Sequence, residues 1–166
     1  MTITVSPDDR CVDAAATARF TASPTLAAAL QAILADLVEL HLQGKQAHWN
    51  LVGPGFRDLH LHLDEIVDAA REAGDTVAER MRALGAVPDG RSDTVATTTT
   101  LPAFPEGEQP TSAIVHLITG RLYAVVDTVR SLHDEVDAED PTTADLLHAV
   151  ISTLEQHAWM MDAAGR

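Results

Sequence analysis

Residues 45–82 have the sequence KQAHWNLVGPGFRDLHLHLDEIVDAAREAGDTVAERMR, and this stretch decides the fold. Glycine and proline at 53–55 separate two helical patterns, so two helices joined by a short turn are predicted. One histidine precedes the turn, and a second histidine and three carboxylates follow it. These candidate metal ligands are His48, His60, Asp64, Asp75 and Glu79.

The four candidate ligands after the turn form two pairs with one spacing. His60 and Asp64 are four residues apart, as are Asp75 and Glu79, so the members of each pair share a helix face. At about 100° per residue, the interval from Asp64 to Asp75 also brings the two pairs onto one face. At ~1.5 Å per residue, however, that interval is about 16 Å along the axis. One helix therefore cannot close both pairs on a single small site.

A two-fold axis would resolve this separation. Two antiparallel copies of the helix, crossing near residues 69–70, would bring the first pair of each copy opposite the second pair of the other. The crossing point lies among alanines and a glycine, which would permit a close approach. An isologous dimer has this symmetry. We therefore predict a site of two histidines and three carboxylates that two chains build together.

The run HWNLVGPGF at 48–56, followed by the two pairs and Arg80, closely resembles the Dps family, the miniferritins also called DNA-binding proteins from starved cells. The resemblance is close over residues 45–91 and looser over 24–162. In that family these positions bind iron at a ferroxidase centre between subunits. The resemblance therefore implies five iron ligands, which are His48, His60, Asp64, Asp75 and Glu79. The Glu-x-x-His motif of larger ferritins, whose diiron sites lie inside one bundle, does not occur in the sequence.

The periodicity of the chain predicts an all-α protein. Residues 1–22 show no clear period and are interpreted as a flexible N-terminal arm, while residues 23–166 form the bundle domain. Four helical patterns begin near 23–24, 56, 111–112 and 140–141. The connection from Pro88 to Pro110, in which Ser92 could cap a short helix, is long enough to cross a bundle. The predicted fold is a ferritin-like four-helix bundle with a long crossover between helices 2 and 3.

The composition limits the class of protein. A chain of 166 residues with 4% aromatic residues suits one helical domain with its own core. Cys11 is the sole cysteine, so no disulfide can form within the chain, and a reducing compartment is expected. The N-terminal sequence does not resemble a signal peptide. The sequence also contains no run of about 18 apolar residues, which an ordinary membrane span would need. These observations favour the cytoplasm.

Two further acidic groups have two interpretations each. The first group consists of Glu65, Asp68 and Glu72. It is either an ordinary solvated face of the second helix or a cavity wall where Fe³⁺ nucleates. The other group either caps a helix or, by resemblance to the family, lines a three-fold pore that admits Fe²⁺. It contains Asp137, Asp140 and Asp145. The remaining histidines are interpreted as ordinary core or surface residues, and they are His41, His62, His116, His133, His148 and His157.

The ligand set suits Fe²⁺, and also Zn²⁺ and Mn²⁺. The resemblance implies a ferroxidase, in which two Fe²⁺ ions would reduce one H₂O₂ to water. O₂ is the other candidate oxidant. The Fe³⁺ that forms would be stored as a mineral core. It also implies a homo-oligomer, a dodecamer in the family, that protects the cell from oxidative damage. A relative that binds Zn²⁺ or another ion without turnover is a weaker alternative.

The alternative function is a DNA-compacting nucleoid protein with a secondary metal site. Family members that bind DNA often carry a lysine-rich tail, whereas residues 1–20 contain no lysine and the net charge of the chain is −14. Phosphate binding depends on several cations that release counterions. The sequence therefore argues against DNA binding and favours iron oxidation and storage.

Overall fold

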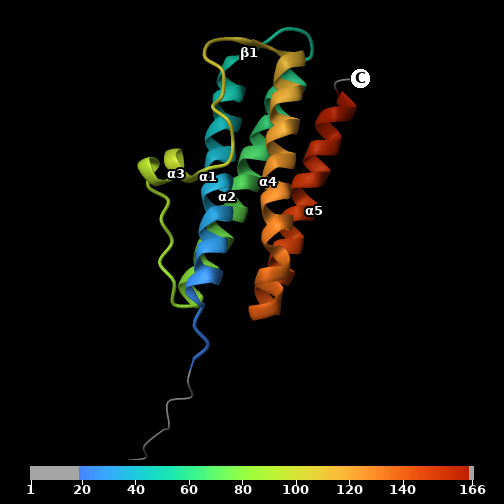
Figure 1. Cartoon of the computed structure of the whole chain (residues 1–166). Helices are drawn as coiled ribbons and strands as arrows, with labels where there is room; N and C mark the ends of the chain where they lie inside the picture. Colours follow the sequence, from blue (N-terminus) through green and yellow to red (C-terminus); the bar gives the residue numbers. More distant parts are fainter. Residues whose placement is uncertain (1–18, 165–166) are drawn as a thin grey trace, which may run out of the picture.

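The computed structural model describes residues 19–164, which contain five helices in chain order (Figure 1). They are α1 (Pro24–Asn50), α2 (Phe56–Ala83), α3 (Ser92–Thr98), α4 (Thr111–Glu139) and α5 (Pro141–Ala164). Two short strands, β1 (Leu51–Val52) and β2 (Gln109–Pro110), pair in parallel. The pairing holds the turn between α1 and α2 against the start of α4.

The four long helices form a bundle of two helical hairpins. α1 packs against α2 and α4 against α5, and contacts of α1 with α4 and of α2 with α5 join the hairpins. Figure 1 shows the connection after α2 running back along the bundle, with α3 beside α1. This arrangement confirms the predicted four-helix bundle with a crossover between its second and third long helices.

Local sequence signals set the helix ends. The Ser23 hydroxyl accepts a hydrogen bond from the Leu26 backbone N–H, and Pro24 occupies the first helical position of α1. Gly55 precedes α2 in the left-handed conformation, with φ of 71°, which glycine adopts without steric cost. One predicted cap is wrong: Ser92 is the first residue of α3, and Arg91 occupies the N-cap position. The extended backbone of Arg91, held to Asp89 by hydrogen bonds, places the boundary one residue earlier.

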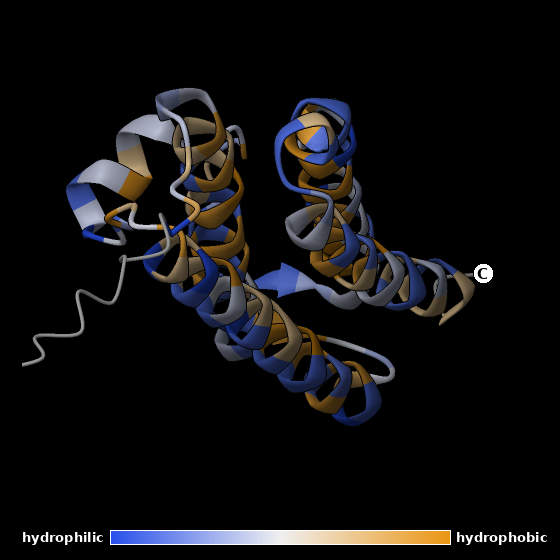
Figure 2. Ribbon diagram, turned by 90° about the horizontal axis from the view of Figure 1, so that it is seen from below, coloured by the Kyte–Doolittle hydropathy of each residue, from blue (hydrophilic) through white to orange (hydrophobic). Residues whose placement is uncertain are grey.

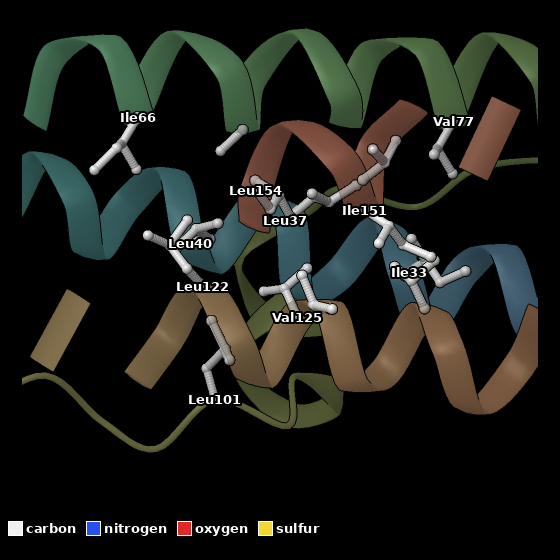
Figure 3. Packing of buried hydrophobic residues seen from close by; sticks show 14 of the residues in the cluster. Ile33, Leu37, Leu40, Ile66, Val77, Leu101, Leu122, Val125, Ile151 and Leu154 are labelled. Carbon is white, nitrogen blue, oxygen red and sulfur yellow. The ribbon is translucent and has the colours of Figure 1, made fainter. Parts of the chain in front are cut away.

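The core lies between the hairpins. Large apolar side chains from all four long helices are fully buried, as Figure 3 shows for Ile33, Leu37, Ile66 and Leu122 among others. Figure 2 shows hydrophobic and hydrophilic residues together on each long helix, as amphipathic packing requires. The buried face of α2 thus points inward, while its acidic residues remain on the outside.

One buried carboxylate ties the crossover to this core. Asp36 of α1 is fully buried, and its two oxygens accept hydrogen bonds from the hydroxyls of Thr99, Thr100 and Thr128 and from the Thr100 backbone N–H, at 2.7–2.8 Å. Four donors satisfy the two oxygens of this buried carboxyl group. The threonine run after α3 therefore has a structural role.

Residues 19–22 pass close to the C-terminal end of α2. The Ala22 N–H donates to the Leu84 carbonyl oxygen and the Arg19 guanidinium to that of Ala83, both at 2.9 Å. The rest of the predicted N-terminal arm, residues 1–18, lies outside the described residues.

α1 and α4 are long and apolar enough, by length and composition alone, to cross a membrane. Core helices of bundles satisfy the same criterion. In this structure 50% of the apolar window of α1 and 39% of that of α4 are buried, and the buried residues include Leu30, Leu37 and Ile118.

Candidate metal centre

The short turn between α1 and α2 brings two of the predicted histidines together. Nδ1 of His48 lies 3.1 Å from the carbonyl oxygen of His60, and Nδ1 of His60 lies 3.1 Å from the carbonyl oxygen of His48. The imidazole rings stack with centroids 3.7 Å apart. Because a carbonyl oxygen can only accept, each Nδ1–H donates to the carbonyl oxygen of the other histidine, and Nε2 is the ring nitrogen outside these two hydrogen bonds.

Asp64 completes a cluster of three within one chain. One ligand atom from each of His48, His60 and Asp64 lies within 4.8 Å of the other two. Oδ1 of Asp64 lies 3.3 Å from Nδ1 of His48 and 2.5 Å from Nζ of Lys45. The hydrogen bond from Lys45 keeps the pKa of the Asp64 carboxyl below its ordinary value, although burial acts in the opposite direction. Asp64 therefore presents an ionised oxygen to solvent.

The second predicted pair stays apart from this cluster within the chain. Asp75 and Glu79 lie further along α2, and both are exposed. Asp75 borders an open cavity of about 650 Å³ between α1, α2 and the residues after α2. Within residues 19–164, Arg82 donates to the Ala86 carbonyl oxygen and forms no ion pair with Glu79. Both carboxylates are thus available to a partner outside the chain.

The predicted pore group divides into different environments. Asp140 is buried between α4 and α5, where it accepts hydrogen bonds from Arg80 at 2.6 Å and from Thr143 at 2.5 Å. Burial alone would raise the pKa of Asp140, but these hydrogen bonds and the Arg80 charge lower it overall. Asp137 and Asp145 are exposed. The surroundings of Asp140 favour the structural interpretation for that residue.

The predicted nucleation group is exposed on α2, and one of its members has unexpected neighbours. Glu65, unlike Asp68 and Glu72, lies beside two histidines that the sequence did not single out, His62 of α2 and His157 of α5. Burial lowers the pKa of both histidines, and the nearby Glu65 opposes this shift. The three-residue spacing of His62 and Glu65 is visible in the sequence and indicates that both lie on one face of a helix. His157 joins them only because α5 packs against α2, which the sequence pattern does not show.

Comparisons with known proteins agree with the fold. The family model of the ferritin-like domain matches residues 27–164. DNA protection during starvation protein of Agrobacterium fabrum is 36% identical over 143 residues, which cover 86% of this chain and 88% of that protein. DNA protection during starvation protein 2 of Deinococcus radiodurans is 36% identical over 135 residues, covering 81% of this chain, which spans 56% of that relative's length.

A solved structure supports the same assignment. Dps from Microbacterium arborescens in the high iron form superimposes with a TM-score of 0.80 at 32% sequence identity, covering 87% of this chain and 97% of that one. In this chain His48, His60 and Asp64, three of the five predicted ligands, cluster beside the turn between α1 and α2. With its crossover bundle and these relatives, the chain belongs to the Dps family of the ferritin-like superfamily.

Proposed function

We propose that this protein is a ferroxidase and an iron-storage miniferritin. The observation that carries the proposal is the convergence of the buried His48 of α1 with the half-buried His60 and Asp64 of α2, while Asp75 and Glu79 remain exposed further along α2. A second copy of the chain would supply Asp75 and Glu79 to complete each site. The structure of a relative in a high iron form supports iron as the substrate.

In the proposed reaction Fe²⁺ is the substrate. Two Fe²⁺ ions each give one electron to H₂O₂, which takes up two protons and leaves as two molecules of water, while both irons become Fe³⁺. Because both electrons reach one peroxide, no hydroxyl radical forms. The two imidazoles would bind through Nε2, and the carboxylates would offset most of the charge of two ferrous ions. O₂ is the other candidate oxidant.

The protein would act as a cytoplasmic homo-oligomer, and by family resemblance as a dodecamer. Large apolar side chains exposed on the single chain support assembly, since Trp49 is 70% and Trp159 is 65% exposed. Fe²⁺ would enter past exposed carboxylates such as Asp137 and Asp145. Fe³⁺ would then collect on the acidic face that carries Asp68 and Glu72.

The names of the relatives favour DNA protection as the result of this activity. Removal of Fe²⁺ and peroxide would protect DNA without contact. Direct binding is the second candidate function, and the net charge of −14 argues against it. A gel-shift assay at low salt separates the two: no retardation is expected, whereas tight binding would favour the DNA-compacting alternative.

The test of the proposed centre compares variants in a ferrous oxidation assay. His60→Ala with Asp64→Ala is expected to lower the oxidation rate at least about tenfold while assembly persists, because ligands hold the metal but do not pack the core. His116→Ala is the matched control, since His116 is exposed on α4. Equal oxidation rates in the double variant and the control would remove the site assignment.

A further inference from the structure

We propose that His62, Glu65 and His157 form a second metal site, which takes a first-row divalent cation such as Zn²⁺. One ligand atom from each residue lies within 4.8 Å of the other two. His62 and Glu65 come from α2 and His157 from α5, two helices that are in contact (Figure 1). The proposal does not depend on ferrous oxidation at the centre around His48.

The spacing of the two ring nitrogens suits a tetrahedral cation. Nε2 of His62 and Nδ1 of His157 face each other at 3.2 Å. Two nitrogens bound tetrahedrally to Zn²⁺ at ~2.0–2.1 Å stand roughly 3.3–3.4 Å apart. The distance between the two nitrogens is therefore close to the distance that two ligands of one cation need, and the rings, with centroids 5.4 Å apart and an interplanar angle of 40°, would turn to point both lone pairs at the ion. Without a cation, the same pair of atoms can share one hydrogen bond.

Glu65 supplies the third ligand and the negative charge. It follows His62 by three residues, so the two side chains share a face of α2. Glu65 is exposed, whereas both histidines are half-buried. The carboxylate approaches from the solvent side and the two imidazoles from the helix interface. These three ligands leave at least one position of a tetrahedral cation for water. The site would therefore exchange its ion readily.

There is room for an ion and its water beside His62. This residue borders a cavity of about 380 Å³ between the start of α2, the start of α4 and the end of α5. Pro54, Thr111 and Ala164 are among the other residues that line the cavity. An ion can therefore approach His62 from this cavity without opening the bundle.

The second site is distinct from the first. His62 follows His60 by two residues, which turns its side chain about 200° around α2, away from α1 and toward α5. All three ligands also belong to one chain. The other close histidine pair, His133 and His148, stacks at 4.5 Å but forms no three-ligand group in residues 19–164. The cluster around His157 is thus the one additional group of three that the described residues bring together.

Titration of the full chain with Zn²⁺ and Co²⁺ tests the proposal. The starting protein carries His60→Ala and Asp64→Ala, which removes two of the five proposed ferroxidase ligands. Calorimetry is expected to show about one additional Zn²⁺ per chain, and bound Co²⁺ should give the visible absorption of histidine ligation. Adding His157→Gln or Glu65→Gln should weaken this binding at least about tenfold. Adding His116→Gln, which changes an exposed histidine of α4, should leave it unchanged.

Two controls keep the outcome decisive. Circular dichroism and particle mass report whether each variant folds and assembles. If His157→Gln fails to assemble, Glu65→Gln decides, because Glu65 is exposed and its replacement leaves the core intact. Equal affinity in Glu65→Gln and His116→Gln would overturn the proposed site. Ferrous oxidation is not measured in this background, so the result is independent of the proposed ferroxidase function.

Discussion

At the scale of single residues, Lys45 influences how Fe²⁺ binds to the proposed centre. The ammonium of Lys45 already holds the Asp64 carboxylate, yet 31% of the lysine side chain and 41% of the aspartate side chain are exposed. An ion pair this exposed is worth only about 0.2–1 kcal/mol. A divalent cation can therefore displace the lysine, whose charge then returns to water.

Lys45→Met should tighten Fe²⁺ binding on the order of two- to fivefold, because the variant keeps the aliphatic stem and removes the competing charge. The measurement is the initial oxidation rate as a function of Fe²⁺ concentration. Lys45→Arg preserves the cation and should stay near the original protein. Weaker binding in Lys45→Met than in Lys45→Arg would indicate that the lysine positions Asp64 for the metal.

Sequence patterns predicted the cluster of His48, His60 and Asp64 but not the cluster that contains His62 and His157, and the reason lies in how far apart the residues are in the chain. His48, His60 and Asp64 lie on either side of one short turn, so local helix geometry is enough to bring them together. His157 lies 95 residues from His62, and no spacing in the sequence connects them. Their contact depends on how α5 packs against α2, which is a property of the tertiary fold.

At the scale of elements, the crossover depends on Asp36. Replacing it by asparagine keeps the shape but removes the negative charge and one of the two acceptor oxygens. We expect Asp36→Asn to lower the free energy of unfolding by about 3 kcal/mol, since several charge-assisted hydrogen bonds are lost at once. Thermal unfolding and limited proteolysis of residues 84–110 measure the effect. Asp93→Asn, an exposed change in α3, is the control, and equal behaviour of the two variants would contradict the anchoring role.

The junction between α4 and α5 should respond to pH through Asp140. The pKa of this carboxyl is lowered in the folded protein, so its stabilising effect is present above the ordinary value of about 4 and is lost as the pH falls through the folded pKa. At pH 7, Asp140→Asn should lower the melting temperature by about 4–8 °C, corresponding to about 2 kcal/mol.

The difference between Asp140→Asn and the original protein should shrink as the pH falls below about 4, and it should disappear below the folded pKa of Asp140, where both carry a neutral group at this position. Melting temperatures over a pH series measure it. Asp137→Asn is the control, because Asp137 is exposed one turn earlier. A loss in Asp140→Asn that is constant with pH would mean that shape, rather than charge, matters here.

The elements themselves were largely predictable because their ends carry local signals. Ser23-Pro24, the glycines of residues 53–55 and Pro141 each set a helix boundary within one or two residues of its observed position. The anchoring of the crossover was not predictable, because Asp36 and Thr128 are 92 residues apart. A threonine run has no local signature that identifies a distant buried carboxylate as its partner.

At the scale of the whole molecule, the proposed centre is incomplete in one chain. The described chain gathers three of the five predicted ligands and leaves Asp75 and Glu79 exposed about 16 Å further along the same face of α2. An isologous dimer would give each site one set of three ligands and one pair. Oligomerisation would then create the active site as well as the shell.

Complementation between two inactive variants tests this shared site. One chain carries His60→Ala and Asp64→Ala, and the other carries Asp75→Ala and Glu79→Ala. Each homo-oligomer should be nearly inactive, because every site lacks a ligand pair. In a mixed dimer one site receives both lesions and the other receives none. With random equal mixing about half of the dimers are mixed, so about a quarter of all sites should be intact.

Co-expression of the two variants, followed by measurement of the ferrous oxidation rate per chain, gives the recovery. If each site were built within one chain, every site would keep its own lesion, and mixed shells verified by mass spectrometry would stay inactive.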